Sequence, residues 1–306
     1  MKRRRIDHRP SLTAQFNAAQ RAAESLQPAD RRLLDDRYSR MYAGRFAPLL
    51  ALPPLARASL RASDRFYTGL HTHVVLRVRY TDDACRQAID AGIDQIVLLG
   101  AGFDTTSLRI KDVDVSIFEV DAPLTLRKKL RINESKNIPV DSRIRWVPCD
   151  FEHDPLPQRL AEAGFDPSRP CLVTWIGVSF YLTPAAFERT VADLAGLSAA
   201  GSRLVLDYGD PEIVTGDHVL AGARRTSRSG RQGGEPYRSG FTPKGLTTLL
   251  AKYDFTECDH VRVPDLARRY APGGQFPYST DDWIGIVTVQ RLNSNRRDAR
   301  NHADIS

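Results

Sequence analysis

Glycines and acidic residues recur where buried strands of this chain are expected to end. Gly100, Ala101 and Gly102 follow the apolar run 96–99, and Asp104 comes two residues later. Glycine lets the backbone turn sharply and lets a ligand lie against it, and aspartate is a favoured N-cap of a helix. A strand, a glycine turn and a helix start are typical of nucleotide sites at the carboxyl edge of α/β sheets.

More acids follow the next two expected strands. Glu119 and Asp121 end the second strand and, by strand alternation, lie on the same side of it. An acid at this place can accept hydrogen bonds from ribose hydroxyls. Asp150 and Phe151 follow the third strand, where a carboxylate could accept from an adenine amino group and a ring could pack on the base. Taken singly, each pattern is equally compatible with an ordinary turn or a solvated strand end.

Together these residues favour an adenosine ligand without phosphates. A dinucleotide fingerprint would have a third glycine where Thr105 stands, and the Gly-Lys-Ser/Thr of a phosphate-cradling loop is absent. S-adenosyl-L-methionine fits, because its single carboxylate needs only one basic partner. Arg77 and Arg79 are candidates for that partner through a bidentate guanidinium contact. An NAD-dependent oxidoreductase is the first rival interpretation.

The elements that must position these residues alternate between strand and helix. The pattern predicts an α/β fold with a doubly wound, mostly parallel, seven-stranded sheet. Its last two strands are expected to form an antiparallel pair without a crossover helix of convincing length between them. The expected strands are 96–99, 115–120, 143–148, 171–176, 201–207, 255–263 and 283–290, and the expected helices include 123–137, 155–163, one that begins at 184, and 243–250.

The chain divides into three expected parts. Residues 1–94 form an N-terminal helical cap, with one helix from residue 11, a second over 33–42 and a further helical stretch over 55–70. Residues 95–291 form the cofactor-binding domain, and 292–306 are expected to be a disordered tail. An irregular segment, 209–240, interrupts the domain as a lid. Its arginines are equally compatible with a clamp for an acidic acceptor and with a solvated loop: Arg224, Arg225, Arg228 and Arg231.

Composition narrows the class of protein. The 306 residues are 42% hydrophobic and 26% charged, and no apolar run approaches the ~20 residues of a membrane span. The basic amino terminus continues into polar residues, which is unlike a signal peptide, and four cysteines without a Cys-x-x-Cys pair disfavour a disulfide scaffold or a zinc site. We therefore expect a cytoplasmic protein without a metal. The net charge of +7 lies mostly at the two ends of the chain, so no nucleic-acid partner is expected.

Few side chains are candidates for the catalytic step. Tyr181, after the fourth expected strand, is the residue we place near the transferred group, although a ring packed against the following helix is as plausible. His71 and His73 could act as a base or as metal ligands, but two histidines without a third ligand are more often surface or capping residues.

Several motifs in the order of a known family carry a resemblance. The chain resembles the leucine carboxyl methyltransferase-type family of class I S-adenosylmethionine-dependent methyltransferases, including its bacterial O-methyltransferase branch, some members of which act in polyketide pathways. The matching segments are 11–14, 21–24, 77–82, 99–105, 118–121, 147–151, 175–182 and 234–241.

The resemblance implies roles for the residues already named. Arg77 would hold the methionine carboxylate, and Gly100 and Gly102 would approach the methionine portion. Asp121, in preference to Glu119, would bind the ribose. Adenine would lie against Asp150 and Phe151.

Two positions depart from the family pattern. Thr106 stands where an arginine often follows the glycine turn, and Ile176 stands where many members have a glutamate. The change at Ile176 removes a polar contact beside the methyl group and puts an inherited preference for carboxylates in doubt.

The function expected is in-line methyl transfer from S-adenosylmethionine to a small-molecule carboxylate or hydroxyl, such as a polyketide or other secondary metabolite. A carboxylate needs no base, whereas a hydroxyl does. Two further interpretations are a methyltransferase acting on protein carboxyls or RNA, and a catalytically silent binding module. No membrane partner is expected.

Overall fold

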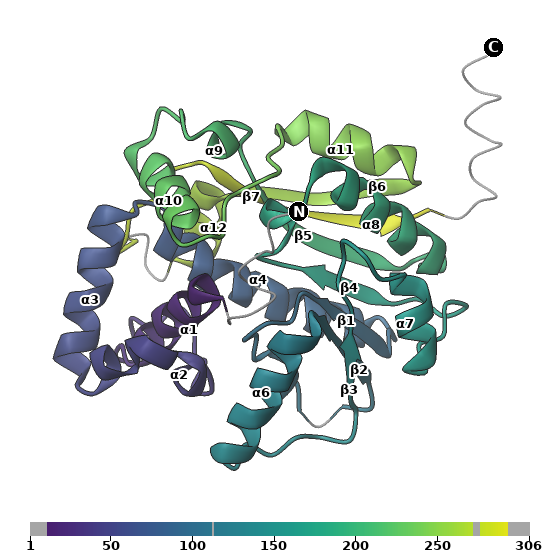
Figure 1. Ribbon diagram of the computed structural model, residues 1–306, viewed down its shortest axis with the longest axis horizontal. Coiled ribbons are helices and arrows are strands. Elements are labelled where there is room, and N and C mark those ends of the chain that lie inside the picture. The colour runs from purple at the N-terminus through teal and green to yellow at the C-terminus, as the bar shows by residue number, and fades with distance from the viewer. Residues whose placement is uncertain (1–10, 112, 272–275, 293–306) are drawn as a thin grey trace.

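A seven-stranded sheet forms the centre of the computed structural model, which describes residues 11–111, 113–271 and 276–292 (Figure 1). The strand order is β3-β2-β1-β4-β5-β7-β6, with parallel pairing from β3 to β5 and antiparallel pairing of β7 with both β5 and β6. The predicted fold class and the antiparallel final pair are confirmed. The strands are β1 (Gln95–Leu99), β2 (Ser116–Asp121), β3 (Ile144–Pro148), β4 (Leu172–Trp175), β5 (Arg203–Gly209), β6 (Phe255–Arg262) and β7 (Ile284–Arg291).

Both faces of the sheet are buried, because successive strand residues point to opposite sides. Val97 and Leu99 belong to a core shared with helices α7 (Leu156–Glu162), α8 (Pro184–Leu197) and α11 (Pro243–Lys252). Ile96 and Leu98 belong to the opposite core, shared with α4 (Leu70–Asp90) and α12 (Val263–Tyr270). Burial on both faces explains why the strands are nearly continuous apolar runs.

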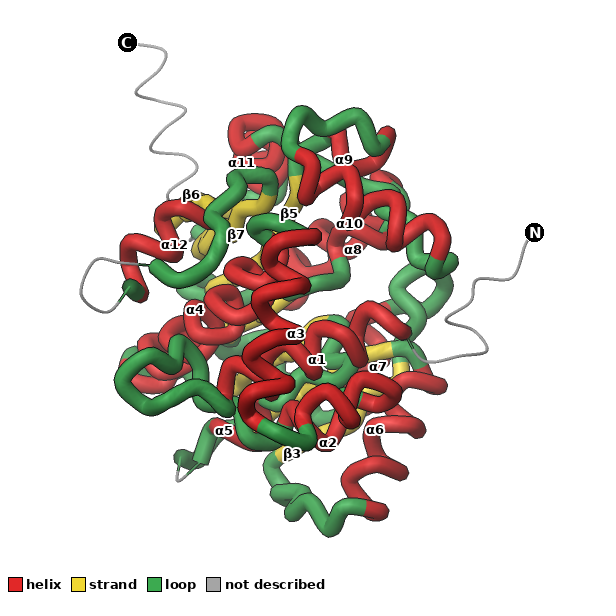
Figure 2. The backbone as a smooth tube through the Cα atoms, turned by 90° about the vertical axis from the view of Figure 1, so that its left-hand side faces the viewer, coloured by secondary structure: helices red, strands yellow, loops and turns green. Residues whose placement is uncertain are grey.

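The amino-terminal helices form a layer beside the sheet, seen from the front in Figure 2. They are α1 (Leu12–Ser25), α2 (Ser39–Tyr42), the 3₁₀ helix η2 (Gly44–Leu50) and α3 (Pro53–Phe66). The prediction of a helix over 33–42 is wrong for residues 33–38, which are not helical. The buried carboxylate of Asp36 accepts hydrogen bonds from Arg21 Nε at 3.0 Å and Thr105 Oγ1 at 2.7 Å, so tertiary contacts hold this segment outside a helix.

The segment 209–240 contains two helices, α9 (Glu212–Thr215) and α10 (Ala221–Gln232), where an irregular loop was expected. The buried face of α10 consists of Gly222, Ala223, Thr226 and Ser227. Small residues bury this face with almost no apolar side chains, and their hydroxyls bond to backbone carbonyls, as Ser227 Oγ does to the Ile213 oxygen at 2.7 Å. A search for apolar periodicity therefore misses the helix.

A third unexpected helix, α12, lies between β6 and β7. It buries Val263, Leu266 and Ala267, and the Arg262 N–H before it donates to Asp265 Oδ2 at 2.9 Å. Helices α5 (Thr106–Arg109) and α6 (Pro123–Ser135) follow β1 and β2. The helix after the glycine turn begins two residues later than Asp104, whose Oδ1 accepts from the Thr106 N–H at 2.5 Å.

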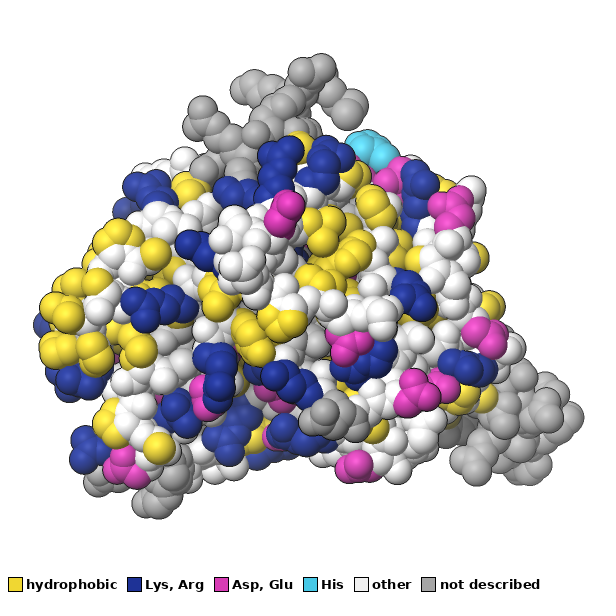
Figure 3. All heavy atoms as spheres, turned by 90° about the horizontal axis from the view of Figure 1, so that it is seen from below, with side chains coloured by type: hydrophobic (Ala, Val, Ile, Leu, Met, Phe, Trp, Pro, Cys, Tyr) yellow, Lys and Arg dark blue, Asp and Glu magenta, His cyan; other side chains and the backbone are white. Residues whose placement is uncertain are grey.

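Two of the predictions concern the ends of the chain, which the structure does not describe. The basic segment 1–9 and all but the first residue of the expected disordered tail, 292–306, lie outside the described residues. The longest helix of the described part, α4, is too polar to span a bilayer, and none of the other described helices meets the requirements of length and apolarity. On the face in Figure 3, Lys and Arg side chains are interspersed with acidic and hydrophobic ones.

Candidate functional site

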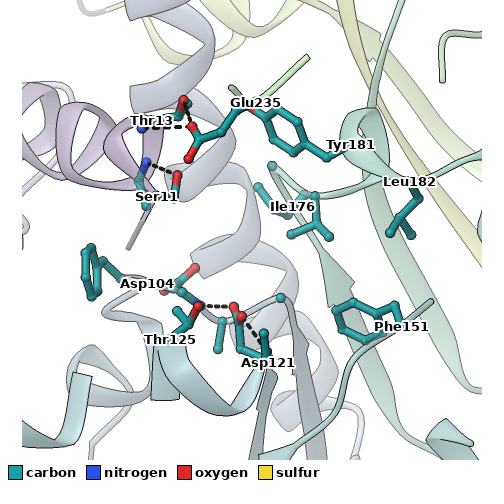
Figure 4. A pocket seen from close by; sticks show the side chains of 18 of the residues that line it. Ser11, Thr13, Asp104, Asp121, Thr125, Phe151, Ile176, Tyr181, Leu182 and Glu235 are labelled. Atoms are coloured by element: carbon teal, nitrogen blue, oxygen red, sulfur yellow. Dashed lines mark hydrogen bonds between the residues drawn. The ribbon is translucent and has the colours of Figure 1, made fainter. Parts of the chain in front are cut away.

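A cavity of about 950 Å³ lies at the carboxyl ends of β1 to β4. Helix α1 and the segment 234–238 also border it, so segments more than 200 residues apart in the sequence meet there (Figure 4). All predicted site residues except Glu119 contribute to its wall: Arg77, Gly100, Ala101, Gly102, Asp104, Asp121, Asp150, Phe151, Ile176 and Tyr181.

The glycine turn after β1 forms one wall of the cavity. Gly100 has φ +75°, and a Cβ there would lie 2.1 Å from Val178 Cγ2, so the turn requires glycine. Gly102 has φ +40°, and a Cβ there would have no neighbour closer than 3.7 Å, which leaves its surface open toward the cavity. The Gly102 N–H donates to Asp121 Oδ2 at 2.6 Å and joins the ends of the first two strands.

The Asp121 carboxylate is held at the end of β2 by backbone donors. Besides Gly102, the Ala122 N–H donates to its Oδ1 at 2.6 Å, and Thr125 lies beside it (Figure 4). Burial raises the pKa of Asp121 to about 6, although these hydrogen bonds favour the ionised form. A carboxylate has about four acceptor positions, so Asp121 can still accept from a ligand.

Glu119 does not reach the cavity. Its carboxylate is fully buried, Lys129 Nζ lies 2.6 Å from Oε2, and the Ser107 hydroxyl donates to Oε1. Strand alternation does put Glu119 on the side of Asp121, but two residues, or about 7 Å, deeper along the strand. At that depth helix α6 covers Glu119 and supplies Lys129. The position of Glu119 therefore does not fit its predicted role as a ribose ligand.

Asp104, Asp150 and Phe151 also line the cavity. Burial raises the pKa of Asp104, but the nearby Arg109 and Arg21 outweigh burial and hold this pKa below its ordinary value. Asp150 Oδ1 accepts from the Glu152 N–H at 3.0 Å. Phe151 is half-buried and packs against the sheet core, so its ring is fixed beside Asp150.

Of the two arginines proposed for a carboxylate, the structure brings only Arg77 to the cavity. Arg77 Nη1 lies 2.8 Å from Asp207 Oδ2, and Arg77 Nε is buried and has no hydrogen-bond partner in the part of the chain that the structure describes. Arg79 points elsewhere: it donates to the Leu33 carbonyl at 3.0 Å and lies over the Tyr270 ring.

The expectation that His71 and His73 are surface or capping residues is wrong, because both are buried within α4. His71 Nδ1 lies 3.0 Å from Gln20 Oε1, and His73 Nε2 lies 3.0 Å from Asp207 Oδ2. Burial lowers the pKa of His73. Among the described residues, no group of three His, Cys, Asp or Glu side chains could hold a metal ion.

Asp207, at the end of β5, is a residue that sequence reasoning missed. It accepts from His73 and Arg77 and also from the Gly177 N–H at 2.7 Å. Burial raises its pKa, but these partners outweigh burial and lower it. The signal was available, since Asp207 is an acid at the end of an expected strand, like Asp121.

Tyr181 lines the cavity from a 3₁₀ turn, η3 (Ser179–Tyr181), and its ring centroid lies 5.5 Å from that of Tyr237. Burial raises the pKa of Tyr181 well above its ordinary value, and Tyr237 and Glu235 act in the same direction. Tyr181 is therefore a neutral hydroxyl at ordinary pH.

Glu235 is a second missed residue, although it lies in the matched motif 234–241. It lines the cavity, is 7% exposed, and accepts from the Thr13 N–H at 3.2 Å and from the Thr13 hydroxyl.

The four lid arginines considered for the clamp do not line the cavity. Arg224, Arg225 and Arg231 donate to backbone carbonyls of the lid and of α3, and Arg228 is exposed. Another arginine of the same segment, Arg238, does border the cavity, and it lies 3.2 Å from Glu152. The proposed clamp for an acidic acceptor therefore has no support in the geometry.

Several known proteins to which this chain is similar are described as methyltransferases. The profile of the family described as leucine carboxyl methyltransferase matches residues 14–195. A Mycolicibacterium vanbaalenii protein named "Putative S-adenosyl-L-methionine-dependent methyltransferase" is 33% identical over 163 residues, 51% of this chain and 52% of that protein, so the chain spans about half the length of this relative. A Mycolicibacterium gilvum protein of the same name is 31% identical over 229 residues, 71% of this chain and 73% of that protein.

A solved structure supports the fold. The crystal structure of a Thermobifida fusca protein described as a methyltransferase superposes with a TM-score of 0.56 at 17% identity, covering 78% of this chain and 89% of that one.

Proposed function

The chain belongs to the leucine carboxyl methyltransferase family, and from this premise we propose that it transfers the methyl group of S-adenosylmethionine to an oxygen of a small molecule. The observation that carries the proposal is the cavity at the carboxyl ends of β1 to β4, whose walls combine a glycine turn with Asp121 and Asp150. Its volume of about 950 Å³ lies in the range of small-molecule sites.

The residues present fit the cofactor. Gly102 leaves open surface at the turn, Asp121 supplies a carboxylate for ribose hydroxyls, and Phe151 supplies a ring for adenine. The unpartnered Nε of Arg77 is a buried donor suited to the methionine carboxylate.

Bound S-adenosylmethionine supplies an activated methyl group whose transfer neutralises the sulfonium charge. The protein's part is to align the acceptor and to exclude water, since orientation can lower the barrier by about 7–11 kcal/mol. Ile176 and Val178 give the centre of the cavity an apolar wall, and Leu182 extends it. Tyr181 is placed to fix an acceptor through its neutral hydroxyl.

The structure argues against a dinucleotide cofactor. A pyrophosphate site needs glycine and a helix amino terminus after the turn, but α5 spans only four residues. The side chain of Thr105 at the third glycine position is fully buried and bonds to Asp36. No comparable observation favours a macromolecular acceptor.

The test is calorimetry with S-adenosylhomocysteine and with NAD, followed by transfer of tritiated methyl groups to a panel of small carboxylic acids, phenols and alcohols. We expect heat with S-adenosylhomocysteine, none with NAD, and radiolabelled product from the panel. Binding of NAD alone, or no heat with the methyl donor or its product, would overturn the proposal.

A further inference from the structure

Glu235 places an acidic group in the cavity away from the acids assigned to the cofactor. It follows α10 and reaches the amino terminus of α1, where its Oε2 accepts from Thr13. Its other oxygen, Oε1, is buried and has no hydrogen-bond partner among residues 11–111, 113–271 and 276–292. Figure 4 shows Glu235 beside Tyr181 at one end of the cavity, with Ile176 between them and Asp121.

The two carboxylate oxygens therefore have different roles. Oε2 satisfies a free N–H at the start of α1, which explains why an acid stands there. Oε1 contributes nothing to that cap, and a buried acceptor without a partner destabilises the folded protein. Such a group in a cavity wall indicates a ligand that donates a hydrogen bond to it.

The two tyrosines beside Glu235 do not offer another base. The raised pKa of Tyr181 keeps its hydroxyl neutral, and burial raises the pKa of Tyr237 in the same way. His73 is buried beneath Asp207 and does not line the cavity. Two nearby cations are already paired: Arg238 lies 3.2 Å from Glu152, and Arg77, which acts on Tyr181 and Tyr237, lies 2.8 Å from Asp207.

We propose that Glu235 Oε1 accepts the hydrogen bond of an acceptor hydroxyl and takes its proton during methyl transfer, so that the acceptor is a phenol or an alcohol. This inference rests on the proposed function. In the step, the acceptor oxygen forms a bond to the methyl carbon while the carbon–sulfur bond breaks. The bonding electron pair stays on sulfur, and the hydroxyl proton passes to Glu235, leaving a neutral thioether and a methyl ether.

A carboxylate acceptor fits this end of the cavity poorly. Two like charges in a buried site repel each other, and an ionised acceptor would leave Oε1 without a hydrogen-bond donor. The side chain of Ile176 is uncharged, and the nearby Arg77 guanidinium is already neutralised by Asp207 at 2.8 Å.

The test compares wild type with E235Q and T13V, after calorimetry with S-adenosylhomocysteine. Glutamine keeps an oxygen for the Thr13 N–H but removes the charge, whereas T13V keeps the charge and removes the Thr13 hydroxyl with its contacts to Oε2 and to Tyr181. We expect all three proteins to bind S-adenosylhomocysteine within about threefold of each other. Absence of binding by wild type would refute the proposed function itself, which is a different outcome from those below.

The probes are 2-naphthol and 2-naphthoate, titrated into each protein loaded with S-adenosylhomocysteine. Wild type and T13V should bind 2-naphthol at least about tenfold more tightly than 2-naphthoate, and E235Q should lose this preference. With 2-naphthol and tritiated donor, E235Q should transfer the methyl group at least about 100-fold more slowly than wild type.

The inference is overturned if wild type binds 2-naphthoate as well as 2-naphthol, or binds neither. It is also overturned if E235Q keeps the preference and the rate. Equal losses in T13V and E235Q would show that Glu235 acts only as the cap of α1.

Discussion

Arg77 Nη1 lies 2.8 Å from Asp207 Oδ2, and both side chains are buried where α4 meets the end of β5. Asp207 also accepts from His73 and from the Gly177 N–H, so one carboxylate holds the arginine and the turn after β4. The Arg77 guanidinium packs closely against Gly177, where a Cβ would lie 3.0 Å from Nη2. The orientation of Arg77 toward the cavity therefore depends on Asp207.

The variant D207N tests this dependence. It leaves Arg77 buried without a counter-charge, so we expect a loss of about 3–5 kcal/mol in the free energy of unfolding, measured with urea. The affinity for S-adenosylhomocysteine should fall at least about tenfold, because Arg77 loses its orientation. The matched control is D30N, which removes an exposed partner 3.7 Å from Arg31 and should change stability by less than about 0.5 kcal/mol. Unchanged affinity in a folded D207N protein would contradict the positioning role.

The raised pKa of Asp121 predicts a pH dependence of cofactor binding. With a pKa of about 6, the carboxyl is ionised at pH 7.5 and largely protonated at pH 5. Because protonation removes acceptor capacity, the affinity for S-adenosylhomocysteine should stay constant above about pH 7 and fall as the pH drops below 6. Calorimetry from pH 5 to 8 measures it, and D121N should bind weakly with a flat profile. A wild-type profile as flat as that of D121N would count against ribose binding by Asp121.

The raised pKa of Asp121 also affects the stability of the protein. Low pH, which weakens cofactor binding, should increase the contribution of Asp121 to the free energy of unfolding. A pKa raised by folding means that the folded protein binds the proton more tightly than the unfolded chain. The contribution of Asp121 to stability is therefore present below the unfolded pKa of about 3.9 and is lost as the pH rises through 6. In urea unfolding measured from pH 4 to 8, the free energy of unfolding of D121N should lack this pH-dependent contribution.

The close approach at Gly100 can be separated from its backbone conformation. G100A places a methyl group 2.1 Å from Val178 Cγ2, whereas G92A has a similar φ, +83°, and nothing within 4 Å. G92A should cost about 1–2 kcal/mol for the left-handed backbone, and G100A should cost more. The double variant G100A/V178A should recover part of the difference, with a coupling energy of at least about 0.5 kcal/mol in unfolding experiments. If the losses in the free energy of unfolding of G100A and V178A simply add in the double variant, the contact between residues 100 and 178 is unimportant.

The buried pair of Glu119 and Lys129 predicts an effect on stability rather than on binding. K129M leaves the Glu119 carboxylate buried and unpaired, so we expect a loss of about 3–5 kcal/mol, of which E119Q/K129M should recover a part. Folded E119Q should bind S-adenosylhomocysteine within about threefold of wild type. A tenfold loss of affinity in E119Q would indicate that Glu119, and not only Asp121, contacts the ribose.

Apolar runs predicted the strands well, because a strand buried on both faces must be apolar at nearly every position. The same rule failed for α10, whose buried face is built from Gly222, Ala223, Thr226 and Ser227. It also failed for residues 33–38, where the carboxylate of Asp36 bonds to residues distant in the sequence. Family membership, inferred from ordered motifs, is confirmed by the matched profile.

Residue types and their order along the chain were enough to predict the sheet, the glycine turn and ten residues of the cavity wall, since each depends on a local pattern. Three contacts became visible only in the folded chain: Glu119 pairs with Lys129, Asp207 holds Arg77, and Glu235 reaches the first turn of α1. Each of these contacts joins side chains from different elements, and the partner of a buried charge depends on packing that no local pattern encodes.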